Sequence, residues 1–157
     1  MAQGTPATNA LRSLGIAFEL ANYAYDPDAE KVGLQAAEAL GESPARVLKT
    51  LIAQVDGKPV CLVLASDREA SMKKVAAAFG GKSAAMMPVP DAERLSGYKV
   101  GGVSPFGQKK RLRTVVDATA TDEPYVYVNG GQRGLQIRLT PADLLRATGA
   151  EAHAIAG

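Results

Sequence analysis

Two β-hairpin signals separated by helical segments constrain this fold more than any other feature of the sequence. Asp56-Gly57 stands between two apolar runs, residues 50–55 and 59–65. Asp-Gly in such a place favours the tight turn that joins two antiparallel strands. Asn129-Gly130-Gly131 separates two later β-prone runs and predicts a second hairpin.

Helical segments lie before, between and after these hairpins. Thr5-Pro6 and Thr140-Pro141 each combine an N-cap residue with a proline in the first turn, which is typical of a helix start. Helices are expected at 7–14, 34–40, 43–49, 72–79, 88–95 and 141–149, and strands at 16–23, 50–55, 59–65, 114–117, 125–128, 135–139 and 151–157. Strands and helices do not alternate regularly. We therefore predict an α/β (α+β) fold with a mixed sheet flanked by helices, not a doubly wound parallel sheet.

Length and composition predict one domain that spans residues 1–157. The chain has 157 residues, of which 46% are hydrophobic and 22% charged, as in ordinary globular domains. Cys61 is the only cysteine, so an internal disulfide is excluded. Because Cys61 lies in the apolar run 60–64, we expect it to be a buried core residue.

Hydropathy and charge indicate whether the chain contacts a membrane, is secreted or binds nucleic acid. No segment approaches the ~20 apolar residues that a membrane span requires. The first residues lack the basic and apolar regions of a secretory signal. We therefore expect a cytoplasmic protein without membrane contact. The net charge is only +2, so binding of nucleic acid would depend on a local basic patch.

The most unusual stretch is the glycine-rich segment 97–113, which contains Gly101, Gly102 and Pro105 and ends in basic residues. Glycines would let backbone N–H groups turn toward a bound carbonyl oxygen or anion, and Pro105 would stiffen the loop. The basic run that follows suits phosphates. A plain glycine loop before the solvated start of a strand would give the same pattern, and the segment matches no Walker or dinucleotide fingerprint.

Lys49 permits two interpretations. It closes the expected helix 43–49, where a cation interacts favourably with the helix C-terminus. Alternatively, its apolar neighbours hold it at the edge of a pocket, where it donates hydrogen bonds to a substrate.

Several common chemistries have no support in the sequence. His153 is the only histidine and lies near the C-terminal end, which disfavours a serine–histidine or cysteine–histidine system. One histidine and one cysteine far apart do not form the usual zinc site. We expect neither a metal nor a cofactor.

The same residues carry a family resemblance. The chain resembles the YbaK/EbsC proteins in Tyr23-x-x-Asp26-Pro27, in Val47-Leu48-Lys49-Thr50-Leu51, in the glycine-rich segment and in Gly130-Gly131-x-Arg133-Gly134-Leu135. The resemblance runs from about Thr5 to Ala154. It implies a relative of the editing domain of bacterial prolyl-tRNA synthetases, with a mixed, partly barrel-like β-sheet surrounded by helices.

The resemblance also implies an activity and a site. The implied activity is deacylation of mischarged proline tRNA, above all cysteinyl-tRNA(Pro), by attack of the substrate thiol on its own ester. The implied partners are this tRNA and, as a helper, prolyl-tRNA synthetase. The expected catalytic residues are Lys49, Gly101 and Gly102; substrate-binding residues are Tyr23, Val32, Val103, Ser104, Pro105, Asn129, Gly130 and Gln136; tRNA-binding residues are Lys109, Lys110, Arg111, Arg113 and Arg133.

Three positions depart from the cysteine-specific pattern. Val32 replaces a frequent aromatic residue, Asn129 a serine and Gln136 an aspartate. They leave open the removal of alanine or another small amino acid. Two further hypotheses are a non-catalytic module that binds a synthetase or tRNA, and a small protein that binds a phosphate ligand.

Overall fold

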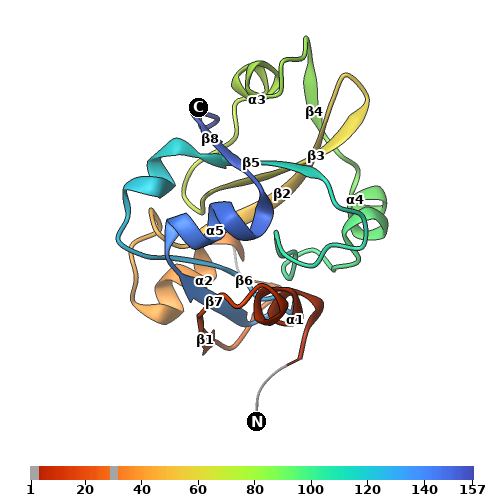
Figure 1. The fold of residues 1–157 in the computed structure, drawn as a ribbon. Coiled ribbons are helices and arrows are strands. Elements are labelled where there is room, and N and C mark those ends of the chain that lie inside the picture. Colours follow the sequence, from red (N-terminus) through yellow and green to blue (C-terminus); the bar gives the residue numbers. More distant parts are fainter. Residues whose placement is uncertain (1–3, 29–31) are drawn as a thin grey trace.

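The computed structural model describes residues 4–28 and 32–157 (Figure 1). The helices are α1 (Pro6–Ser13), α2 (Val32–Leu40), α3 (Met72–Ala78), α4 (Val89–Ser96), α5 (Pro141–Thr148) and a 3₁₀ helix, η1 (Ala118–Asp122). The strands are β1 (Glu19–Asn22), β2 (Leu48–Val55), β3 (Lys58–Ala65), β4 (Ala84–Met86), β5 (Arg113–Asp117), β6 (Val126–Asn129), β7 (Leu135–Leu139) and β8 (Glu151–His153).

The strands form two sheets, and the larger one is mixed as expected. Its order is β4-β2-β3-β5-β8, with β2 antiparallel to both β3 and β4, and β5 parallel to both β3 and β8. The smaller sheet is antiparallel, in the order β1-β7-β6. Both predicted hairpins, β2–β3 and β6–β7, are confirmed.

The two sheets meet at the start of β2. A bridge pairs Val47 with Tyr127 of β6, and the Tyr127 amide donates a 2.8 Å hydrogen bond to the Arg46 carbonyl. The expected barrel-like character is limited to this junction, since in the described part of the chain the strands do not close into a barrel.

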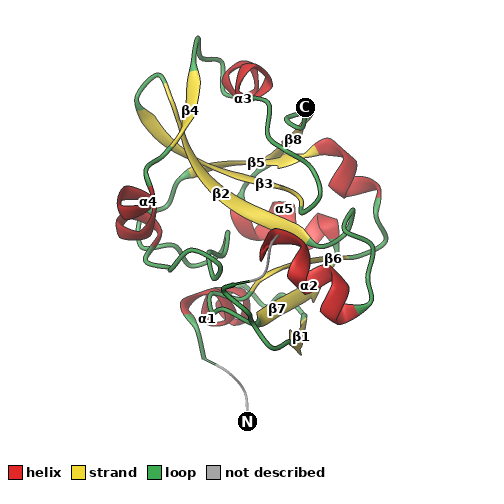
Figure 2. Cartoon of the chain, turned by 180° about the vertical axis from the view of Figure 1, so that it is seen from behind, coloured by secondary structure: helices red, strands yellow, loops and turns green. Residues whose placement is uncertain are grey.

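Helices cover the large sheet unequally on its two faces. Val75 and Phe79 of the α3 region pack on Leu62, Leu64 and neighbouring side chains of one face. The opposite face contributes Ile52, Cys61 and Val63 to a larger core, which α1, α5 and the small sheet also fill. Figures 1 and 2 show α3 at one end of the molecule, and α1 with the small sheet at the other.

The helix starts follow from local capping. The Thr5 hydroxyl accepts a hydrogen bond from the Thr8 amide, and the Thr140 hydroxyl accepts one from the Asp143 amide. Each satisfies an amide that the first helical turn leaves without an intrahelical acceptor. The two caps predicted from Thr-Pro pairs are therefore confirmed.

One predicted helix is wrong. Residues 44–46 form only a turn, in which the Arg46 amide bonds to the Ser43 carbonyl at 3.1 Å. The Ser66 amide donates a hydrogen bond to the Val47 carbonyl. β-Pairing therefore extends back to the turn, and Lys49 lies within β2. Lys49 is consequently not a helix C-terminal cation. The short β4 and η1 were not predicted from the sequence.

No helix among the described residues has both the length and the apolar character needed to cross a bilayer.

Candidate functional site

A cavity of about 390 Å³ opens beside β2, where the two sheets diverge. Its walls come from β2, α4, the loop after α4 and the small sheet. Figure 2 shows α4 on one side of β2, with α2 and the small sheet on the other. Six residues expected at the site from the sequence line this cavity: Tyr23, Lys49, Gly101, Val103, Asn129 and Gln136.

The floor of the cavity is an open strand edge. Along this edge the Arg46 carbonyl pairs with β6, and the Ile52 carbonyl accepts the Met87 amide at 3.1 Å. Leu48 and Thr50 lie between them, and alternate residues of a strand direct their backbone N–H and C=O groups to the same side. The parallel bridge between Val47 and Tyr127 directs the Leu48 amide at the Tyr127 carbonyl, and among the described residues no strand pairs with Thr50 on this side. The Leu48 carbonyl and the backbone N–H and C=O of Thr50 are thus available to a ligand.

Two buried polar atoms in the cavity wall also lack partners. Gln136 is 4% exposed and its Oε1 has no hydrogen-bond partner in the described structure, and the same holds for Thr50 Oγ1. Buried polar atoms are rarely left unsatisfied in native proteins, and both of these residues line the cavity, which makes them candidate contacts for a polar group. Thr50 was not among the residues expected at the site, although it lies in the Val47–Leu51 motif.

Tyr23 stands beside Gln136 at the wall of the cavity. Burial, and to a lesser degree the neighbouring Tyr25, raise the pKa of the Tyr23 phenol, and the Gln136 side chain and Gly134 backbone oppose this shift. Tyr23 is therefore a neutral hydroxyl at neutral pH and can donate or accept a hydrogen bond.

The glycine-rich loop reaches the cavity at Gly101 and is tied down by its neighbours. Gly101 has φ +90°, and a Cβ there would lie 2.5 Å from the Tyr25 hydroxyl, so the position requires glycine. Asn129 Nδ2 donates to the Gly101 carbonyl at 3.1 Å, and Arg133 Nε donates to the Val100 carbonyl at 2.8 Å. Asn129 and Arg133 thus hold the loop in place.

The remaining loop residues lie behind this wall. The Gly102 amide donates to the Lys99 carbonyl at 2.8 Å, and a Cβ at Gly102 would lie 2.9 Å from the Arg133 amide nitrogen. Ser104 is fully buried, and Pro105 faces a separate hollow between α1 and α5.

Two further residues expected at the site, Gly130 and Val32, lie outside this loop. The Gly130 carbonyl accepts a hydrogen bond from the Thr5 hydroxyl. Val32 begins α2, and its side chain lies outside the described residues.

Lys49 lies at the edge of the cavity and is mostly buried. Its side chain is 21% exposed, and Nζ lies 3.8 Å from Oε1 of Glu69, whose side chain is 96% exposed. Side chains alternate along a strand, and Leu51 packs toward α3 whereas Ile52 packs into the larger core. Thr50 therefore shares the face of Ile52, and Lys49 begins on the face of Leu51.

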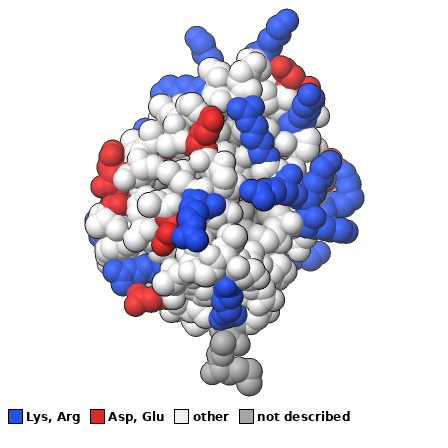
Figure 3. All heavy atoms as spheres, in the orientation of Figure 1, with Lys and Arg blue, Asp and Glu red and all other residues white. Residues whose placement is uncertain are grey.

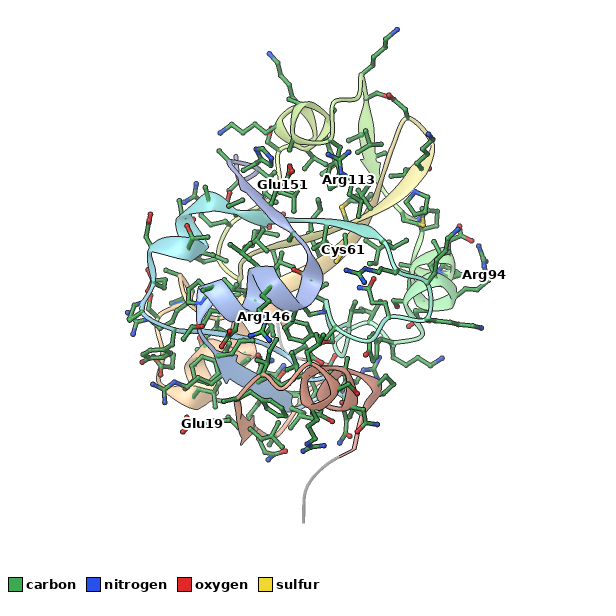
Figure 4. All side chains as sticks on the ribbon, in the orientation of Figure 1. Glu19, Cys61, Arg94, Arg113, Arg146 and Glu151 are labelled. Atoms are coloured by element: carbon green, nitrogen blue, oxygen red, sulfur yellow. The ribbon has the colours of Figure 1, made fainter. Side chains whose placement is uncertain are left out.

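The five basic residues expected to bind tRNA do not form one cluster. The exposed Lys109 and Lys110 lie beside the last turn of α4, where their amides bond to the Ser96 and Leu95 carbonyls. Arg111 lines the hollow near α1 and α5, and Arg133 lies over the Tyr25 ring. Arg113 covers the Phe79 ring next to α3. Figure 4 shows it well apart from Arg94, which marks the position of α4, the helix beside Lys109 and Lys110.

Cys61 and His153, the other residues considered for chemistry, do not line the cavity. Burial raises the pKa of the Cys61 thiol to about 11, which makes it inert and confirms its expected place in the core. His153 pairs with Glu151 at 3.0 Å on β8. Within the described residues, no three His, Cys, Asp or Glu side chains are close enough to hold a metal ion.

Comparison with known proteins identifies the family of this chain. A family profile described as the aminoacyl-tRNA editing domain matches residues 26–147. The chain is 39% identical over 114 residues to EbsC of Enterococcus faecalis, a candidate Cys-tRNA(Pro)/Cys-tRNA(Cys) deacylase, covering 71% of this chain and 69% of that protein. It is 26% identical over 114 residues to the multifunctional Ser/Thr-tRNA deacylase ProXp-y of Escherichia coli, covering 69% and 68% of the two chains.

A solved structure shows the same fold over the full length. A crystal structure described as a candidate trans-editing enzyme for prolyl tRNA synthetase aligns with a TM-score of 0.85 at 22% identity, covering 99% of both chains. The match of the family profile to most of the sequence and the identity to EbsC agree with this fold. The chain therefore belongs to the aminoacyl-tRNA editing domain family, whose named members are aminoacyl-tRNA deacylases.

Proposed function

We propose that this protein, as a single domain over residues 1–157, clears mischarged proline tRNA in trans, with cysteine as the preferred acyl group. The family supports deacylation of aminoacyl-tRNA. EbsC, the relative at 39% identity, is named as a candidate deacylase of Cys-tRNA(Pro) and Cys-tRNA(Cys). This name supports the choice of cysteine and proline tRNA.

The observation that carries the proposal is the cavity beside the open edge of β2. An aminoacyl ester brings an ammonium group and a carbonyl that both need hydrogen-bond partners once they leave water. Gln136 Oε1, Thr50 Oγ1 and the Leu48 and Thr50 carbonyls offer acceptors for the ammonium. The backbone amides of Thr50 and Gly101 offer donors for the carbonyl oxygen.

Substrate-assisted chemistry suits this lining. The described residues that line the cavity include no histidine, cysteine, aspartate or glutamate. In the proposed reaction the substrate thiolate attacks its own ester carbonyl. A carbon–sulfur bond forms, the carbon–oxygen ester bond breaks, and the thiol proton passes to the released ribose oxygen by way of water. The cyclic thioester then hydrolyses to free cysteine.

A thiol is the only common amino-acid side chain suited to this step without a protein base. With a pKa near ~8.5, a few per cent of it is ionised at neutral pH. Holding it against the carbonyl replaces a bimolecular encounter by an intramolecular one. We assign Lys49 to orienting the substrate or terminal ribose, Gly101 to contacting the carbonyl, and Gly102 to shaping the loop. Tyr23, Val103, Asn129 and Gln136 would contact the acyl group or support the wall that does.

A second candidate is removal of serine, threonine or alanine by a bound water. Gln136 is the observation that favours it, because a neutral amide can hydrogen-bond a hydroxyl as well as an ammonium. ProXp-y, the more distant relative, is named for serine and threonine. The departures at Val32 and Asn129 point the same way.

Deacylation of proline tRNA charged with cysteine, serine or alanine tests these candidates side by side. We expect cysteine to be released at least tenfold faster than serine, since an alcohol has almost no anion at neutral pH. The Cys61→Ala variant is the control, because its thiol is buried and its loss should leave the rate unchanged. Equal rates for the three esters would favour the water mechanism, and no release from any of them would favour a non-catalytic module.

The proposed partners are the mischarged tRNA and, for specificity, prolyl-tRNA synthetase. The modest net charge of +2 supports a need for such a helper, because it offers little long-range attraction to RNA. This assignment places the protein in the cytoplasm, where charged tRNA is used.

A further inference from the structure

Exposed apolar side chains gather at the mouth of the candidate cavity. Four large hydrophobic residues of the described structure are strongly exposed: Leu14 (46%), Met86 (46%), Val89 (53%) and Val100 (44%). Met86, Val89 and Val100 all line this one cavity. Leu14 borders the separate hollow between α1 and α5. We call the first three residues the apolar rim.

Backbone contacts hold the apolar rim in place. Met86 ends β4, and the next residue, Met87, donates its amide to the Ile52 carbonyl. Val89 is the first residue of α4. After α4, the Val100 amide donates to Glu93 Oε2 at 2.9 Å and its carbonyl accepts from Arg133 Nε at 2.8 Å. The rim is thus part of the folded wall.

This arrangement calls for a ligand with two different parts. The cavity lining is largely apolar but includes Thr50 and Gln136, each with a buried polar atom that lacks a partner in the described structure, and the rim offers apolar surface to water. Exposed apolar groups that border a cavity with a few polar groups mark binding sites, since apolar surface in water and unpaired polar atoms both cost free energy. The ligand should place a polar group inside and a flat apolar group outside.

We propose that the apolar rim binds the base of the 3′-terminal adenosine of tRNA. This inference rests on the proposed function. The acyl group of a charged tRNA is esterified to the terminal ribose, so an acyl group inside the cavity leaves the ribose at the mouth and the base against the rim. Apolar side chains and the polarisable sulfur of methionine pack well on the face of a base.

The charges around the apolar rim fit the rest of the RNA strand. Lys99 precedes Val100, and Lys109 and Lys110 run beside the last turn of α4, which also carries Arg94. Figure 3 shows Lys and Arg side chains concentrated on the side of the molecule where α4 lies, while acidic side chains are more frequent on the opposite side. Phosphates preceding the terminal nucleotide would meet these cations.

Binding of an uncharged RNA minihelix tests the inference without any deacylation. One minihelix ends in the normal terminal adenosine and the other has an abasic terminal nucleotide. Both are titrated against the wild-type protein and against M86S, V89S and V100S. We expect the wild-type protein to bind the complete minihelix at least fivefold more tightly than the abasic one. Each rim variant should lose most of this preference.

L14S is the matched control, because Leu14 has the same exposed fraction as Met86 but lies at the other hollow. It should keep the full preference. A wild-type protein that binds both minihelices equally overturns the inference, and so do rim variants that keep the preference. The same variants losing affinity for prolyl-tRNA synthetase but not for RNA would also overturn it and assign the rim to a protein partner. Because the assay measures only binding, an absence of deacylation would contradict the proposed function separately.

Discussion

Lys49 sits in a strand at the cavity edge, and its nearest acidic neighbour, Glu69, is almost fully exposed. Because Glu69 remains in water, this ion pair contributes little to stability, about 0–1 kcal/mol. We therefore expect Lys49→Ala to melt within a few degrees of the wild-type protein. Deacylation should fall by tenfold or more, which corresponds to about 1.4 kcal/mol of activation free energy.

Glu69→Ala is the matched control for this prediction. It removes the same ion pair but leaves the ammonium group, so it should keep near-normal activity. Wild-type rates in Lys49→Ala would remove Lys49 from the site, and equal losses in both variants would assign the effect to the ion pair.

Thr50 allows a sharper separation of stability from activity. Its hydroxyl is buried without a partner in the described structure, and valine has nearly the same shape without the hydroxyl. Thr50→Val should therefore be as stable as the wild-type protein or slightly more stable, because it removes an unsatisfied polar atom. Its kcat/KM for the preferred aminoacyl-tRNA should fall severalfold. Thermal melting with steady-state deacylation checks this, and unchanged kinetics would show that the hydroxyl contacts no substrate.

At the scale of elements, Asp117 anchors the C-terminal segment to β5. The buried Asp117 carboxylate accepts hydrogen bonds from the amides of Ile155 and Ala156 at 2.9 and 3.2 Å. Burial alone would raise the pKa of Asp117, but hydrogen bonds from Thr119 and these amides outweigh burial and lower it. A lowered folded-state pKa stabilises the fold above the unfolded value of about 3.9.

This contribution is lost as the pH falls through the folded-state pKa of Asp117. The wild-type free energy of unfolding should accordingly decrease below about pH 4. Asp117→Ala leaves two buried amides unsatisfied and should cost about 2 kcal/mol or more at pH 7. Asp117→Asn keeps an acceptor, so it should cost less and flatten the acid dependence. Denaturant titrations between pH 3 and 7 measure both effects, and an acid profile unchanged in Asp117→Asn would contradict the assignment.

The segment 43–49, which was wrongly predicted to be a helix, also positions the site. Residues 43–49 have helix-compatible composition, yet Val47 pairs with Tyr127 and its carbonyl accepts the Ser66 amide. These partners lie far along the chain, so no local pattern could reveal that pairing would override helix propensity. The outcome is an open β2 edge at Leu48 and Thr50 in place of a helix end.

At the scale of the whole molecule, charge is distributed unevenly although the net charge is only +2. Lys109 and Lys110 are exposed beside α4, the helix that carries part of the apolar rim. Replacing both with glutamine should weaken tRNA binding and flatten its salt dependence, since each phosphate contact adds about 0.7–0.9 to the log–log slope.

Arg113→Gln is the matched control, because that side chain covers Phe79 near α3 instead. It should leave the slope unchanged. Titrations of tRNA at several salt concentrations give the slopes, and a double lysine variant with the wild-type slope would show that the RNA follows another face.

Features that depend on neighbouring residues could be predicted from the sequence alone. The Asp56-Gly57 hairpin, the Thr-Pro helix starts and the buried Cys61 run depend on turn geometry, capping and hydropathy, which a short stretch specifies. The motifs at 47–51 and 97–110 also indicated the family, which the profile match confirms, because their order and spacing are visible without a structure.

The assembly of these motifs depends instead on tertiary contacts. Such contacts separate the strands into two sheets that meet at Val47, expose the β2 edge, and leave Thr50 and Gln136 unsatisfied in one cavity. They also disperse the basic run, since successive residues after a loop leave it in different directions. These features arise where segments far apart along the chain come together. Their energies depend on which surfaces meet, and that information is not present in any single stretch of the chain.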